Sequence, residues 1–125
     1  MIAYTSLGTN DLARANKFYD ELLGIMGAGR AMEDPERFTL WAGADGGPMF
    51  GVFKPLDGNP ATVGNGVMIS LAAENPAAVD KLYAKAMELG AKDAGEPGVR
   101  MDPFYIGYVH DLDGHKINFF CSKDA

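Results

Sequence analysis

The sequence has very little cysteine or histidine and no long hydrophobic run. Cys121 is its single cysteine in 125 residues, which excludes an internal disulfide and any cysteine-rich zinc or iron–sulfur site. No apolar run approaches the roughly 18 residues that a membrane span needs. The N-terminus lacks the basic and apolar regions of a signal peptide. We therefore expect a cytoplasmic protein in a reducing compartment.

Basic residues are also scarce. The chain has 11 Lys and Arg against 17 Asp and Glu, a formal net charge of −6. Such a chain repels phosphate backbones, so we expect neither nucleic acid nor a membrane as a partner. What is present is typical of one globular domain, with 47% hydrophobic and 22% charged residues. The 16 glycines and 7 prolines indicate frequent turns.

Two segments have the apolar spacing of amphipathic helices, residues 11–23 and 76–89. Asn10 is expected to cap the first helix. Asn75 followed by Pro76 is a typical start for the second, because proline is favoured at the first helical position. A glycine directly after each stretch of apolar positions ends the predicted helix.

The other apolar runs predict strands. Asp-Gly pairs at 45–46 and 113–114 separate two pairs of such runs and predict hairpin turns. The predicted strands cover residues 2–9, 29–32, 38–43, 49–53, 66–72, 98–101, 104–110 and 116–121. Residues 55–65, rich in Pro and Gly, are predicted to be a linker.

The chain contains an internal repeat. An offset of 64 places Ser6-Leu7 on Ser70-Leu71, and a later offset of 68 places Asp45-Gly46 on Asp113-Gly114. Each half then has the order strand, helix, three strands. The halves cover residues 1–54 and 66–125 of a single domain spanning 1–125. This predicts an α+β fold of two βαβββ modules that form a curved mixed sheet around a cavity.

A resemblance to a known family lies in residues 7–12, 17–19, 79–83, 90–91 and 111–117. These segments resemble the vicinal oxygen chelate superfamily, also called the glyoxalase/bleomycin-resistance/dioxygenase family. The last, Asp-Leu-Asp-Gly-His-Lys-Ile, is similar to the family's Asp-Pro-Asp-Gly ending, with Leu112 in place of proline. The resemblance implies the βαβββ fold, a small-molecule cavity and a homodimer.

The resemblance also places four positions that hold metal ligands in metal-using members, one on the first and one on the last strand of each module. Here they are occupied by Tyr4, Phe50, Met68 and Asn118. None supplies the imidazole or carboxylate that Zn²⁺, Ni²⁺, Fe²⁺ or Mn²⁺ prefers. The sequence therefore predicts no metal and no cofactor.

These four residues are instead expected to bind a ligand. Phe50 and Met68 would form an apolar floor facing the cavity, with Tyr4 and Asn118 as polar groups. We therefore expect a metal-free binder of a small organic molecule. The alternative is a metal-dependent glyoxalase-like lyase or isomerase, or a dioxygenase, which the resemblance alone supports. Arg37 and Arg100 are either anion contacts or solvated surface residues.

Three further residues have reactive side chains. His110 and His115 flank the 111–114 turn and are expected to be turn residues, although His110 could transfer protons if it faced the cavity. Cys121 lies on a predicted strand and is expected to be buried. The sequence names neither a substrate nor a reaction.

Overall fold

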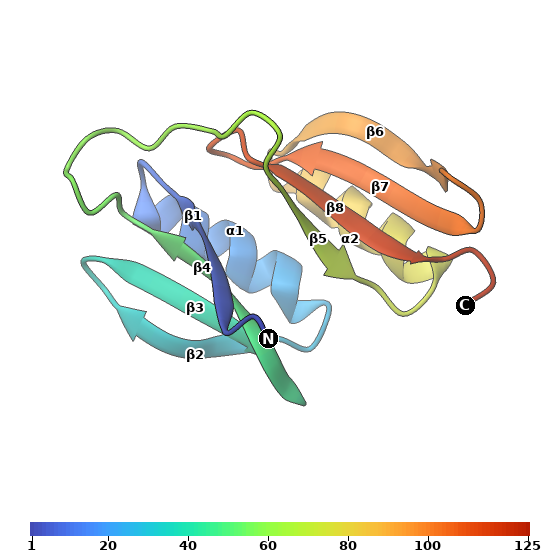
Figure 1. Ribbon diagram of the computed structural model, residues 1–125, viewed down its shortest axis with the longest axis horizontal. Helices are drawn as coiled ribbons and strands as arrows, with labels where there is room; N and C mark the ends of the chain where they lie inside the picture. The colour runs from blue at the N-terminus through green and yellow to red at the C-terminus, as the bar shows by residue number, and fades with distance from the viewer. The chain divides into compact units, whose positions relative to one another are not determined.

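The structure, a computed structural model, describes all 125 residues and divides into two compact units. Module 1 is Met1–Val63 and module 2 is Gly64–Ala125. Module 1 contains β1 (Tyr4–Gly8), α1 (Leu12–Gly24), β2 (Gly29–Asp34), β3 (Phe38–Gly43) and β4 (Gly46–Phe53) (Figure 1). Module 2 contains β5 (Met68–Ala72), α2 (Pro76–Glu88), β6 (Lys92–Val99), β7 (Phe104–His110) and β8 (Lys116–Ser122). The α+β class and the repeated βαβββ order are confirmed.

Each module builds one mixed four-stranded sheet. The strand orders are β1-β4-β3-β2 and β5-β8-β7-β6. In both sheets the first and last strands of the module pair in parallel, and the other neighbours are antiparallel. One helix packs on each sheet, α1 in module 1 and α2 in module 2 (Figure 1). We call the opposite side of each sheet its helix-free face.

The starts of the two helices follow different rules. Asn75 caps α2 as predicted, and its Oδ1 accepts a hydrogen bond from the Ala78 backbone N at 2.9 Å. In α1 the expected cap was wrong by one residue, because Asp11 accepts the Arg14 N–H at 3.0 Å. Asn10 instead bonds Ala61 twice, accepting from its N at 2.7 Å and donating to its O at 3.2 Å. The Asn10 side chain, which the local pattern assigned to the helix cap, is therefore engaged in a long-range contact.

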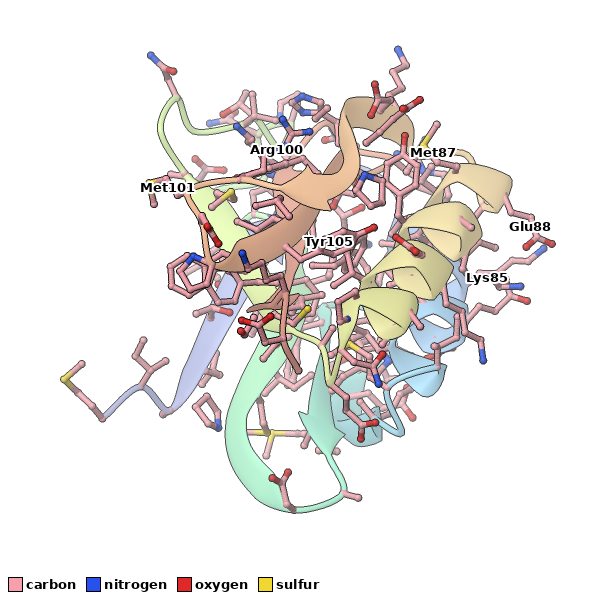
Figure 2. All side chains as sticks on the ribbon, turned by 90° about the vertical axis from the view of Figure 1, so that its right-hand side faces the viewer. Lys85, Met87, Glu88, Arg100, Met101 and Tyr105 are labelled. Atoms are coloured by element: carbon pink, nitrogen blue, oxygen red, sulfur yellow. The ribbon has the colours of Figure 1, made fainter.

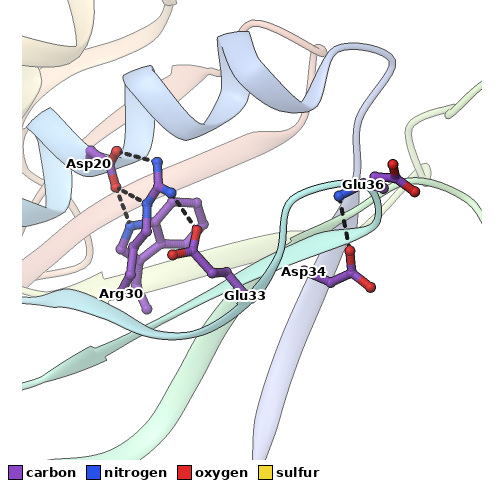
Figure 3. A network of polar contacts seen from close by, with 6 residues as sticks. Asp20, Arg30, Glu33, Asp34 and Glu36 are labelled. Carbon is purple, nitrogen blue, oxygen red and sulfur yellow. Dashed lines mark hydrogen bonds and ion pairs between the residues drawn. The ribbon is translucent and has the colours of Figure 1, made fainter.

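The core of module 1 lies between α1 and its sheet. Tyr19 and Trp41 are each 1% exposed, and their ring centroids lie 5.7 Å apart. Asp20 accepts the Trp41 indole N–H at 2.9 Å and two hydrogen bonds from Arg30. Arg30 also pairs with Glu33, so its guanidinium lies between two carboxylates (Figure 3). The hydrogen bonds from Arg30 lower the pKa of Asp20.

The core of module 2 is built in the same way. Val79, Leu82 and Ala86 of α2 are buried, as are the β8 residues Ile117 and Phe119. Tyr105 on β7 donates its hydroxyl to Asp80 of α2 at 2.7 Å. Figure 2 shows Tyr105 beside α2. Cys121 is buried as predicted, and this burial raises the pKa of its thiol.

Some strand boundaries differ from the prediction. β6 covers Lys92–Val99 rather than 98–101, because two register shifts, on either side of Gly95, let it pair with β7 from Lys92 to Val99. β4 begins at Gly46, inside the predicted turn. Residues 55–63, expected to be linker, group with module 1. No helix is both long and apolar enough to cross a lipid bilayer.

Candidate functional site

The helix-free face of module 1 carries a stack of three aromatic rings. Phe53 lies between Phe38 at 4.9 Å and Tyr4 at 6.1 Å, centroid to centroid, with interplanar angles of 11° and 12°. Tyr4 is 49% exposed. The candidate residue Tyr4 therefore presents a ring and a hydroxyl on the side of the sheet away from α1.

Phe50 lies on the other side, and the expectation that it faces a cavity is wrong. Its ring centroid is 4.8 Å from that of Tyr19 on α1 and 6.2 Å from that of Trp41. Side chains alternate along a strand, so Phe50 and Phe53 point to opposite faces. Phe50 is a core residue of module 1.

The pairing of the strands explains the error. Ser6 and Ser70 are equivalent in the repeat; Ser6 pairs with Gly51, and Ser70 pairs with Asn118. The residue equivalent to Asn118 is therefore Gly51 rather than Phe50. Module 1 has one residue more than module 2 between its turn glycine and this position, which the offset of 68 did not include. A one-residue slip moves a side chain to the other face of the sheet.

Gly51 leaves no free space for a side chain. A Cβ built on it would overlap the Leu40 Cδ2 atom and lie 3.0 Å from the Phe53 ring and 3.3 Å from the Thr5 carbonyl oxygen. Leu40 is 3% exposed. Hydrocarbon therefore fills the volume that a metal-binding side chain would need at this position.

Module 2 places Met68 and Asn118 on its helix-free face. Met68 pairs with Lys116, and Asn118 pairs with Tyr108 and with Ser70. Met68 is 40% exposed, whereas Asn118 is only 2% exposed. The Asn118 Oδ1 atom is buried and has no hydrogen-bond partner. A buried acceptor without a partner costs free energy, and a donor from a bound molecule would remove that cost.

Tyr108 on the same face has two cationic neighbours. The Arg100 guanidinium carbon lies 5.7 Å from the ring centroid, and the Lys116 Nζ atom lies 5.1 Å from it. Arg100 also donates to the Glu96 carbonyl oxygen at 2.8 Å. Figure 2 shows Arg100 next to Met101 in the segment after β6. Sequence reasoning singled out Arg100 but missed Lys116, which the β7–β8 alternation could have placed on one face with Tyr108.

A measurable hollow of about 530 Å³ lies in module 1. Its lining includes the Phe53 ring, the cationic residues Arg37 and Lys54, and apolar side chains of the segment after β4. The volume is in the range of small-molecule pockets. Arg37 thus borders a hollow, although the structure holds no ion pair for it.

The two histidines belong to the β7–β8 turn. The His115 backbone N donates to Asp111 Oδ1 at 2.9 Å, and His110 Nδ1 lies 3.2 Å from the Gly114 carbonyl oxygen. The expectation that they are turn residues is confirmed. No group of three or more His, Cys, Asp and Glu side chains is arranged to hold a metal ion.

The positions that the resemblance assigns to metal ligands do not fit a metal. With the corrected register, module 1 offers Tyr4 and Gly51, and module 2 offers Met68 and Asn118. Neither pair contains an imidazole or a carboxylate. Glycine has no donor atom, and a neutral amide is a weak ligand.

Comparisons with known proteins agree with the fold. The family model of the Glyoxalase/Bleomycin resistance protein/Dioxygenase superfamily matches residues 1–119, and the chain belongs to this superfamily. The chain is similar to a glyoxalase/bleomycin resistance protein from Albidiferax ferrireducens T118, with 35% identity, 96% and 97% of the two chains covered and a TM-score of 0.87.

More distant structures share the fold alone. A glyoxalase-related enzyme from Fulvimarina pelagi is 20% identical, with 96% of this chain and 86% of that chain covered and a TM-score of 0.78. A lactoylglutathione lyase from Agrobacterium tumefaciens is 19% identical, with 96% and 92% covered and a TM-score of 0.69. No curated protein matches the chain.

Proposed function

We propose that this chain is a metal-independent binding protein for a small organic molecule. One observation carries the proposal: the buried Oδ1 atom of Asn118, the residue that the resemblance places at a metal-ligand position, has no partner. This oxygen would accept a hydrogen bond from the ligand, while Met68 would contact an apolar part of it. In module 1, Tyr4 would offer a ring and a hydroxyl group.

The chemistry of the faces supports binding rather than metal catalysis. Pockets for small molecules combine mostly apolar walls with a few placed polar groups. The module 1 hollow has the volume of such a pocket, about 530 Å³, and its lining joins Phe53 and apolar loop residues to the charged residues Arg37, Lys54 and Asp57. The filled space at Gly51 leaves no room for a ligand to a metal. Phe50 has no part in the proposed site.

A thermal-shift screen tests the proposal. The full chain is screened against aromatic metabolites, thiol conjugates and antibiotics, each with EDTA and with added Zn²⁺, Ni²⁺, Fe²⁺ or Mn²⁺. We expect at least one compound to raise the melting temperature equally with EDTA and with metal. A shift that requires metal would contradict the proposal and favour a metal-dependent lyase, isomerase or dioxygenase.

Substitution at Asn118 then tests the site. Asn118→Ala should weaken binding of such a compound by about 1 kcal/mol, the net value of one hydrogen bond, or roughly fivefold in Kd. Cys121→Ala is the control, because Cys121 lies on the same strand but points to the helix side. Isothermal titration calorimetry measures both, and equal affinities for the two variants would refute the role of Asn118.

We also propose that the chain acts as a homodimer in the cytoplasm. Support comes from β2 and β6, which are edge strands, and from exposed apolar side chains on or beside them: Met32, Val99 and Met101 are 56%, 55% and 82% exposed. Bare edges and apolar patches favour association. Sedimentation velocity at micromolar concentration should give a dimer; a species of 13.4 kDa would contradict it.

A further inference from the structure

The helix-free face of module 2 gathers positive charge around one ring. In the strand order β8-β7-β6, Tyr108 is on the middle strand, Lys116 is on β8, and Arg100 follows β6. Both cations lie within 6 Å of the ring centroid. Gly95 makes room for this arrangement, because a Cβ there would lie 3.1 Å from the Tyr108 ring and 3.3 Å from Arg100 Nη2.

The charges of the two cations are not neutralised by a salt bridge. The ion pairs of module 2 join Lys85 to Glu88 and Lys123 to Asp102, and neither includes Arg100 or Lys116. The charge of Arg100 contributes to lowering the pKa of Asp93. The Asp93 carboxylate, however, already accepts hydrogen bonds from the Tyr83 hydroxyl and the Gly95 N. In a chain with a net charge of −6, two cations without acidic partners at one ring are unexpected.

Asn118 adds a requirement of a different kind. It pairs with Tyr108 across the β7–β8 ladder, so their Cβ atoms are about 5 Å apart. It also lies two residues from Lys116 on the same strand and face, so the Cα atoms of these two residues are about 7 Å apart. An anion alone would satisfy Arg100 and Lys116 but not Asn118, because the Oδ1 atom only accepts hydrogen bonds.

We infer that the ligand of this face is an organic anion that also carries a hydrogen-bond donor at a distance from its charged group. Its carboxylate or phosphate would lie near Arg100 and Lys116, its hydroxyl or N–H would donate to Asn118 Oδ1, and its apolar part would contact Met68. This inference names the ligand class of the site in the proposed function and rests on that function.

Three related probes separate the two requirements. 4-Hydroxyphenylacetate has both the anion and a distant donor, its methyl ester lacks the charge, and phenylacetate lacks the donor. Each is titrated into the full ¹⁵N-labelled chain, with NMR shifts of the residue 108, 116 and 118 amides as the readout. We expect the hydroxy acid to bind about tenfold more tightly than its ester and about fivefold more tightly than phenylacetate.

Variants assign each preference to its residues. Arg100→Gln with Lys116→Gln should abolish the preference for acid over ester, and Asn118→Leu should abolish the preference for hydroxyl while keeping that for the acid. Lys81→Gln, an exposed lysine on α2, is the charge control and should change neither. Added salt should weaken binding of the acid but not of the ester.

The outcomes distinguish this inference from the proposed function. If the ester binds at these amides as tightly as the acid, the ligand is not an anion and the inference fails, whereas binding at the site stands. If phenylacetate binds as tightly as the hydroxy acid, the role of the donor fails. If none of the three probes shifts these amides at millimolar concentration, the inference fails, and the thermal-shift screen then decides the proposed function separately.

Discussion

Gly51→Ala is expected to destabilise module 1, because the space beside Gly51 is already filled. The new methyl group would overlap Leu40 Cδ2 and press on the Phe53 ring. Leu40 is buried, and the third neighbour is the Thr5 carbonyl oxygen, which belongs to the β1 backbone and has little freedom to move. Overpacking of this kind costs about 1–3 kcal/mol.

Urea denaturation measures the change in the free energy of unfolding. Trp41, the single tryptophan, lies on β3 beside β4 and reports on module 1 through its fluorescence. Gly29→Ala is the matched control, since a Cβ on this β2 glycine would meet no atom within 4 Å. We expect the control to change stability by less than about 0.5 kcal/mol.

A double-mutant cycle with Leu40→Ala identifies the cause. Leu40→Ala alone removes buried methyl groups and should cost about 2–5 kcal/mol. It also removes the atom that the Gly51→Ala methyl overlaps, so the double variant should be more stable than the sum of the single changes predicts, by about 1 kcal/mol. Additive effects, or a Gly51→Ala variant as stable as the parent, would refute the claim that this position is filled.

Two further predictions concern polar contacts of single side chains. Asp20→Ala removes the acceptor of the buried Trp41 indole N–H and should cost about 1–3 kcal/mol in urea denaturation, whereas Asp20→Asn keeps an acceptor oxygen and should cost less; equal costs would contradict this. Burial, together with the Asp93 carboxylate that accepts its hydroxyl, raises the pKa of Tyr83 to about 12. A folded-state pKa above the ordinary value of about 10 means that the neutral phenol contributes stability below pH 10, and that this contribution is lost between pH 10 and 12. Ultraviolet titration should show late-titrating tyrosine absorbance that is reduced in Tyr83→Phe, while the part from Tyr105, whose pKa the hydrogen bond to Asp80 also raises, remains.

The local patterns of the sequence were sufficient for the fold. Asn75 and Pro76 mark the start of α2 by a capping bond that involves only neighbouring residues. The strands 38–43 and 104–110 were predicted with the bounds that the structure has. The repeat then required each half to use these elements in the same order. Such features depend on interactions over a few residues, which a sequence displays directly.

The predictions were wrong where contacts between residues far apart in the sequence determine the structure. Asn10 is a residue type that often caps helices. Its side chain instead forms hydrogen bonds with the backbone of Ala61, which is far along the chain. Phe50 was placed by counting from the turn, and the count was wrong because the β3–β4 hairpin shifts its register between Trp41 and Gly43. Neither the composition nor the hydrophobic periodicity of a sequence reveals an extra residue in a hairpin. Only the strand pairing shows that Gly51 stands opposite Ser6.

The two bonds between Asn10 and Ala61 bear on how binding preference can diversify on this scaffold. Lys54 N bonds the Arg37 carbonyl oxygen at 2.8 Å, so the chain between Lys54 and Ala61 is fastened to module 1 at both ends. It borders the hollow without contributing to either core. Insertions between fastened ends cost little free energy, since the entropy of loop closure grows slowly with length. Natural or engineered changes in the segment between Lys54 and Ala61 can therefore alter which ligands the hollow accepts, while the strands of the sheet keep their register.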